Sequence, residues 1–140
     1  MSIQKVNHNV IRFWNGTEGA LATAGAGVEG ADKKTSEWVD VNGWTDKVVS
    51  FEIDSAGTID ADVVLHVSPQ HYYELNNKTC TTDDYVAIGI VEAHTAAILV
   101  RKDASDIDDL QRPFRSCRAV IENDQAQAIT DFSVWIEGWS

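Results

Sequence analysis

Residues 48–54 read Val-Val-Ser-Phe-Glu-Ile-Asp, and residues 61–69 read Ala-Asp-Val-Val-Leu-His-Val-Ser-Pro. In the first stretch Val49, Phe51 and Ile53 alternate with polar residues, which is the period-two pattern of a strand with one buried face. The second stretch alternates in the same way. Its Ser-Pro end predicts that the strand stops there, because proline cannot donate a hydrogen bond to a neighbouring strand. These two stretches indicate a β-sheet protein.

Similar segments continue in both directions along the chain. Strand-like runs recur at 9–14, 38–41, 85–92, 96–102, 115–123 and 129–139. The Asn42-Gly43 pair predicts a tight turn, and the neighbouring runs 85–92 and 96–102 predict a hairpin. The polar stretch 70–84 predicts a long loop or a short helical turn. No segment of a dozen residues has helical periodicity, so the sequence predicts an all-β, antiparallel β-sandwich, jelly-roll-like, with seven or eight strands.

The N-terminal part of the chain has a different composition. Residues 16–35 interleave five glycines with alanines, and each glycine disfavours helix by about 1 kcal/mol relative to alanine. We therefore expect residues 1–35 to form a flexible N-terminal arm, in which residues 9–14 are a short strand or an extended segment. Residues 36–140 are expected to form the sandwich domain.

The charge of the chain excludes some classes of partner. Among 140 residues, 22 are acidic and 11 are basic, which gives a formal net charge of −11. Affinity for nucleic acid depends on Lys and Arg neutralising phosphate, so we expect no nucleic-acid partner. Anionic membrane surfaces are disfavoured for the same reason, and no apolar run reaches the ~20 residues of a membrane helix. Cys80 and Cys117 lack the spacing of a zinc site and are expected to be free thiols in a reducing cytoplasm.

The sequence contains no recognisable catalytic or metal-binding pattern. His66 lies on the polar face of its strand, lacks a paired histidine and is expected to be solvated. No Gly-x-Ser-x-Gly motif occurs. The acidic run from Asp103 to Asp109 lacks the spacing of a calcium loop and predicts a solvated loop. We expect no cofactor and no enzymatic activity.

Tryptophan and arginine are the candidate contact residues, because both are enriched at protein interfaces. The alternative is that most tryptophans fill the core or its rim and that the arginines pair with internal carboxylates. Trp135 alternates out of phase with Val134 and Ile136, so it should face away from their core layer. The candidate interface residues are Arg12, Phe13, Trp14, Trp38, Trp44, Arg112, Arg115, Arg118 and Trp135.

The order of the segments resembles that of small β-sandwich virion proteins of tailed bacteriophages. The resemblance rests on Trp38–Gly43, Val48–Ile53 and Ala61–Pro69, and near the C-terminus on Phe114–Ile121 and Phe132–Gly138. It implies a capsid decoration (cement) protein, or a head or tail accessory protein, without enzymatic activity. The implied partners are the major capsid protein and further copies of the same chain, in a homotrimer. The implied location is the capsid surface of a virion, after synthesis in the host cytoplasm.

A second function remains open from the residues alone. Sugar-binding modules on sandwich folds use aromatic platforms, and this chain has five tryptophans together with an acidic rim able to hold Ca²⁺. The alternative function is therefore a carbohydrate-binding, lectin-like module.

Overall fold

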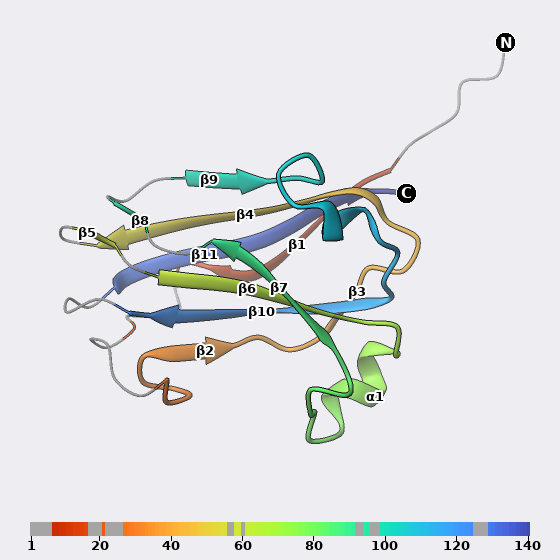
Figure 1. Cartoon of the computed structure of the whole chain (residues 1–140), viewed down its shortest axis with the longest axis horizontal. Coiled ribbons are helices and arrows are strands. Elements are labelled where there is room, and N and C mark those ends of the chain that lie inside the picture. Colours follow the sequence, from red (N-terminus) through yellow and green to blue (C-terminus); the bar gives the residue numbers. More distant parts are fainter. Residues whose placement is uncertain are drawn as a thin grey trace, which may run out of the picture.

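Two antiparallel sheets packed face to face form the body of the protein (Figure 1). The computed structural model describes residues 7–16, 21, 27–55, 58–59, 61–91, 94–95, 99–124 and 129–140. Within these residues it contains eleven strands, one short α-helix and one 3₁₀ helix.

Each sheet contains four main strands. Sheet A has the spatial order β1 (His8–Asn15), β11 (Ile129–Trp139), β4 (Thr45–Ser55) and β9 (Leu99–Lys102). Sheet B has the order β2 (Lys33–Thr35), β10 (Ser116–Asn123), β6 (Ala61–Ser68) and β7 (Val86–Val91), and β3 (Val39–Asp40) also pairs with β10. The short strands β5 (Thr58–Ile59) and β8 (His94–Thr95) pair with each other, and the helices are α1 (Tyr72–Asn76) and η1 (Asp108–Gln111).

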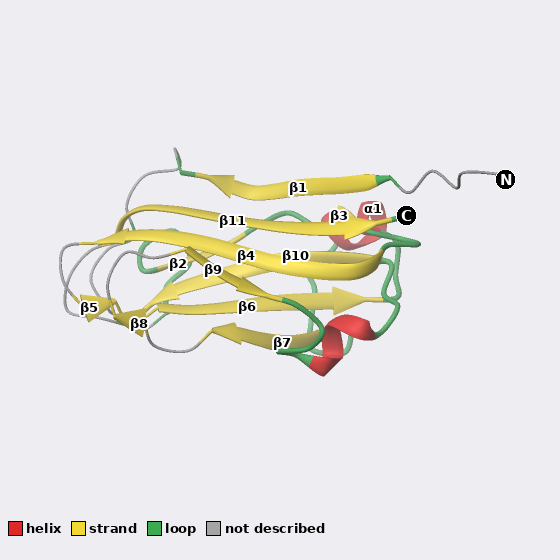
Figure 2. Ribbon diagram, turned by 90° about the horizontal axis from the view of Figure 1, so that it is seen from above, coloured by secondary structure: helices red, strands yellow, loops and turns green. Residues whose placement is uncertain are grey.

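The connectivity of the eight main strands is that of a jelly roll. Numbered along the chain, they follow the order 1-8-3-6 in sheet A and 2-7-4-5 in sheet B. This is the arrangement of two sheets built from Greek-key connections. In Figure 2, β1, an edge strand of sheet A, and β7, an edge strand of sheet B, lie on opposite sides of the molecule. The predicted all-β, antiparallel jelly-roll fold is confirmed.

The alternation in the sequence sets which side chains enter the core. Val49, Phe51 and Ile53 of β4 are each 1% exposed, and Val134 and Ile136 of β11 are fully buried. From sheet B, the alternating core residues are Val63, Leu65, Ala119 and Ile121. The Asn42-Gly43 turn before β4 is also confirmed, and Gly43 adopts a φ of 80° that suits glycine.

The hairpin predicted for residues 85–102 is wrong. β7 pairs with β6 in sheet B, whereas β9 pairs with β4 in sheet A, so the chain crosses from one sheet to the other between them. Both runs are apolar enough to cover the same core from opposite sides. Sequence proximity therefore did not decide the pairing.

The sandwich begins before residue 36. Residues 8–15 pair with β11, and residues 33–35 pair with β10, so parts of the expected N-terminal arm are strands of the two sheets. The reason for β1 is its own alternation, which directs Ile11 and Phe13 towards the core. A shift in the pairing with β11 between Arg12 and Trp14 then brings Trp14 into the core as well. Residues 17–20 and 22–26 of the expected arm lie outside the described residues.

Two further expectations can be compared with the structure. The polar stretch 70–84 contains the short helix α1, as predicted. Cys80 and Cys117 are both free, and burial raises the pKa of the Cys117 thiol. No helix in the described part of the chain is long and apolar enough to cross a membrane.

Candidate interaction faces

The outer face of sheet A gathers tryptophan, arginine and aliphatic side chains. Strand alternation turns these residues away from the core, because their neighbours Val134, Ile136 and Val49 are buried. We call this surface the tryptophan–arginine face. Its members are His8, Val10, Arg12, Val48, Ser50, Glu52, Leu99, Arg101, Trp135, Glu137 and Trp139.

Glu137 is the polar centre of this face. Its Oε2 accepts a hydrogen bond from His8 Nε2 at 2.9 Å, and its Oε1 accepts one from the Trp135 indole N–H at 3.1 Å. Arg101 Nη2 lies 3.1 Å from the same Oε1. Burial alone would raise the pKa of Glu137, but the hydrogen bonds from His8 and Trp135 and the charge of Arg101 lower it below its ordinary value. Glu137 is therefore held as a carboxylate by the imidazole, indole and guanidinium groups around it.

Cations and an imidazole cover the two tryptophan rings. The Arg12 guanidinium lies 4.9 Å from the centroid of Trp135, and the His8 ring stacks on Trp139 with centroids 4.9 Å apart. Ser50 sits between Trp135 and Arg101 in the strand register and is completely buried, although it points outwards. The large side chains on either side account for this burial.

Aliphatic side chains complete the tryptophan–arginine face at its two edges. Val10 on β1 is 45% exposed, and Leu99 on β9 is 53% exposed. Protein interfaces are enriched in Trp and Arg, and carboxylates are depleted in them. Of the two carboxylates of this face, Glu137 is already paired, whereas Glu52, opposite Leu99 in the strand register, is exposed. Around Glu137 the face thus has the composition of a protein-binding surface.

A second cluster covers the outer face of sheet B. Arg118 Nε donates to His66 Nδ1 at 3.0 Å, and the Tyr85 ring stacks on His66 with centroids 3.9 Å apart. The Arg118 guanidinium also lies 4.8 Å from the centroid of Trp38. Burial, followed by the charges of Arg118 and Lys33, lowers the pKa of His66 to about 4. The expectation of a solvated His66 is wrong, because residues from other elements cover it.

A residue of helix α1 holds the backbone of Trp38 in place. The Asn76 side chain accepts a hydrogen bond from the Trp38 backbone N–H at 2.8 Å and donates one to the Trp38 carbonyl at 3.0 Å. The indole N–H of Trp38 is buried and has no partner in the structure. This cluster binds the helix to the sheet and is mainly structural.

The nine residues proposed from the sequence lie in several places. Arg12 and Trp135 meet on the tryptophan–arginine face, Trp38 and Arg118 meet on sheet B, and Trp44 and Arg115 line one hollow at an end of the sandwich. Arg112 is exposed and lies 3.4 Å from Asp109. Trp14 is in the core, edge-on to Phe132, and Phe13 packs against the core.

Sequence reasoning missed His8, Arg101 and Glu137. A signal for Glu137 was present, because it is in phase with Trp135 and Trp139 on one strand. His8 and Arg101 come from strands distant in the sequence, and only the pairing brings them to Glu137. Among the residues that the structure describes, no group of three or more His, Cys, Asp or Glu could hold a metal ion.

Comparison with known proteins identifies structural neighbours only. No protein-family model and no curated protein matches the chain. It is similar to the structure of infectious bursal disease virus, Gt strain, with a TM-score of 0.51 and 9% identity over 96% of this chain and 33% of that one. The VP2 subviral particle of infectious bursal disease virus gives a TM-score of 0.50 and 8% identity, over 95% and 32%. The xylan-binding module CBM15 gives a TM-score of 0.45 and 15% identity, over 94% of this chain and 97% of that one.

These similarities concern the fold. The chain spans about a third of the length of the viral chains that it matches. At identities of 8% and 9%, what is shared with them is the jelly-roll arrangement of strands.

Proposed function

We propose that this chain is a structural protein of a virus particle, a capsid decoration (cement) protein of a tailed bacteriophage. In this proposal it binds the shell of the major capsid protein from outside, as a homotrimer, and stabilises the shell. It is made in the host cytoplasm and has no enzymatic activity.

The tryptophan–arginine face is the observation that carries the proposal. It presents Trp135, Arg12 and exposed Leu99 on the outer surface of sheet A. Elsewhere the chain is strongly acidic, with a net charge of −11. A face on which tryptophan, arginine and aliphatic side chains predominate is suited to a partner surface with apolar patches and carboxylates. The jelly roll shared with a protein of a viral particle supports the same role by analogy of fold.

Co-sedimentation with assembled shells tests the proposal. The shells are assembled from the major capsid protein encoded in the same genome, and each variant is sedimented with them. Arg12→Glu and Leu99→Asp each place a charge on the face without touching the core. We expect each to weaken shell binding at least about tenfold, the effect of losing about 1.4 kcal/mol at an interface.

The matched control is Tyr73→Asp. Tyr73 is 66% exposed on α1, away from the tryptophan–arginine face, so this variant should bind shells like the wild type. Light scattering of the free protein tests the trimer, which should have three times the mass of the 15.4 kDa chain. A protein that does not sediment with shells would contradict the proposed function, and a monomer would contradict the trimer.

Carbohydrate binding is the second candidate function. It is favoured by Tyr73, which is 66% exposed on α1, whereas the neighbouring Tyr72 ring is already stacked on His71 with centroids 4.6 Å apart. Against it, the rings of Trp135 and Trp139 already have Arg12 and His8 on them, where a sugar platform needs an open ring face. Titrating tryptophan and tyrosine fluorescence with a glycan panel, with and without a chelator, distinguishes the two functions.

A further inference from the structure

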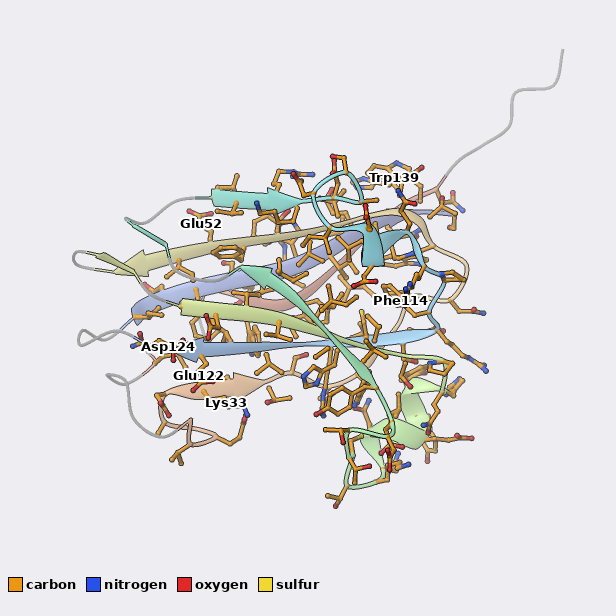
Figure 3. All side chains as sticks on the ribbon, in the orientation of Figure 1. Lys33, Glu52, Phe114, Glu122, Asp124 and Trp139 are labelled. Carbon is orange, nitrogen blue, oxygen red and sulfur yellow. The ribbon has the colours of Figure 1, made fainter. Side chains whose placement is uncertain are left out.

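Three hollows join at one end of the sandwich, the end that carries Phe114 and Trp139 in Figure 3. Their volumes are about 240, 410 and 230 Å³. Pro113 lines all three, Phe114 lines the first and the second, and Trp44 lines the second and the third. We call these three adjacent hollows the end groove.

The first hollow is apolar and reaches the core layer. Its wall includes Val67, Ile88 and Phe114, together with Val86. Val86 is in phase with Ile88 and Ile90, which are 3% and 4% exposed, yet Val86 itself is 58% exposed. An inward-facing strand position is thus left uncovered beside a hollow large enough for an aliphatic side chain.

The middle hollow contains Arg115 as the only charged residue of its described lining. The Arg115 backbone is fixed, because its carbonyl accepts from Val41 N–H at 2.9 Å and its N–H donates to the Ser68 carbonyl at 3.0 Å. Its side chain is exposed, and no ion pair joins it to a carboxylate of the described residues. A guanidinium placed in this way offers two parallel donors to an incoming carboxylate.

Lys47 adds a buried cation behind the same surface. It is 2% exposed, its Nζ lies 4.6 Å from the Phe114 ring centroid, and within the described residues it donates one hydrogen bond, to the Trp44 carbonyl at 3.4 Å. With Arg112 and Arg115, the end groove has three cations against two carboxylates, Asp46 and Asp109.

The charge of the end groove contrasts with that of the rest of the molecule. Asp109 is already paired with Arg112 at 3.4 Å. The opposite end of the molecule carries Glu52, Glu122 and Asp124 together with Lys33 (Figure 3), and the chain as a whole has a net charge of −11. The end groove should therefore repel an acidic partner less than the opposite end of the molecule does.

We infer that the end groove binds an extended, acidic segment of a partner protein. An aliphatic side chain of the segment fills the first hollow beside Val86, and a neighbouring carboxylate pairs with Arg115 in the middle hollow. Lys47 strengthens the attraction through its charge, because it is screened little by water. This site is separate from the tryptophan–arginine face and goes beyond the proposed function.

Two fluorescein-labelled peptides test the inference against the full chain. One alternates leucine with glutamate, and the other has glutamine in place of each glutamate, so that the two share their apolar side chains. Fluorescence anisotropy gives the affinities. We expect the acidic peptide to bind at least tenfold more tightly and to lose affinity as salt is raised.

Two variants locate the site. Arg115→Gln should abolish the preference for the acidic peptide, whereas Val86→Trp, which fills the first hollow, should weaken both peptides. Arg12→Gln, on the tryptophan–arginine face, should change neither affinity. Equal binding of the two peptides, no binding of either at millimolar concentration, or an acidic preference that survives Arg115→Gln would overturn the inference.

Discussion

Arg101 Nη2 lies 3.1 Å from Glu137 Oε1, and the two residues come from strands that have β4 between them. The same carboxylate also accepts a hydrogen bond from His8 on β1. One side chain therefore links strands on both sides of β11 across the outer surface of sheet A. We expect this link to restrain the His8, Glu137 and Arg101 side chains before any partner binds, which lowers the entropy cost of binding.

The first prediction concerns Glu137→Gln. The amide has the shape of the carboxylate but no charge, so the ion pair with Arg101 is lost and the bond from His8 weakens. Hydrogen bonds to charged groups contribute about 1.5–3 kcal/mol, so we expect the free energy of unfolding to fall by about 1–2 kcal/mol. Urea denaturation measures the change. The control is Glu52→Gln, at an exposed position of β4, which should change the free energy of unfolding by less than about 0.5 kcal/mol. Equal losses in both variants would contradict the prediction.

The second prediction concerns Ser50→Ala. The Ser50 hydroxyl is buried and has no hydrogen-bond partner in the structure. An unsatisfied buried polar group costs about 1–3 kcal/mol, so its removal should leave stability unchanged or raise it by about 1 kcal/mol. Ser116→Ala is the control, since the equally buried Ser116 hydroxyl donates to the Gln70 carbonyl at 2.7 Å. In this control the free energy of unfolding, measured by heat or urea, should fall by about 1 kcal/mol. A comparable fall for Ser50→Ala would refute the prediction.

The fold could be predicted from the sequence as far as it depends on local patterns. Alternation identifies the buried faces of β4 and β11 without knowledge of their partners. Pairing between strands depends on the whole core, and for this reason β7 and β9 were wrongly joined as a hairpin. In the N-terminal part, the nearby glycines concealed that β1 continues sheet A.

The candidate surfaces were predictable to a smaller extent. The outward direction of Trp135 follows from its phase on β11, and the structure agrees. The burial of His66 does not follow from its own strand, because Tyr85 and Arg118 supply the cover from other elements. The end groove is also non-local, since Trp44 and Arg115 are 71 positions apart and meet only in the folded chain.

The third prediction concerns the titration of His66. Its folded pKa of about 4 lies below the ordinary 6.5, so the folded state resists protonation and stability should fall as the pH drops from about 6.5 to about 4. Arg118→Met removes a nearby positive charge and should raise the His66 pKa towards 6.5. Proton NMR titration of the imidazole C–H signals measures it. Arg101→Met, on the other sheet, should leave the His66 titration unchanged, and a His66 pKa near 6.5 in the wild type would disprove the prediction.

The fourth prediction concerns Lys47→Met. Burial lowers the pKa of Lys47 from its ordinary 10.5, so the unfolded chain binds the proton more tightly than the folded one. Methionine keeps the length of the side chain and its contact with Phe114 but has no charge to desolvate. We therefore expect the free energy of unfolding to rise by about 1 kcal/mol at pH 7. The cost of the lysine diminishes as the pH rises through the folded pKa towards 10.5, because the folded protein then releases the proton. Urea unfolding of both proteins between pH 7 and pH 10.5 should therefore show the advantage of the methionine variant shrinking with pH. An advantage that is constant or grows over this range would show that Lys47 is hydrated in the folded protein.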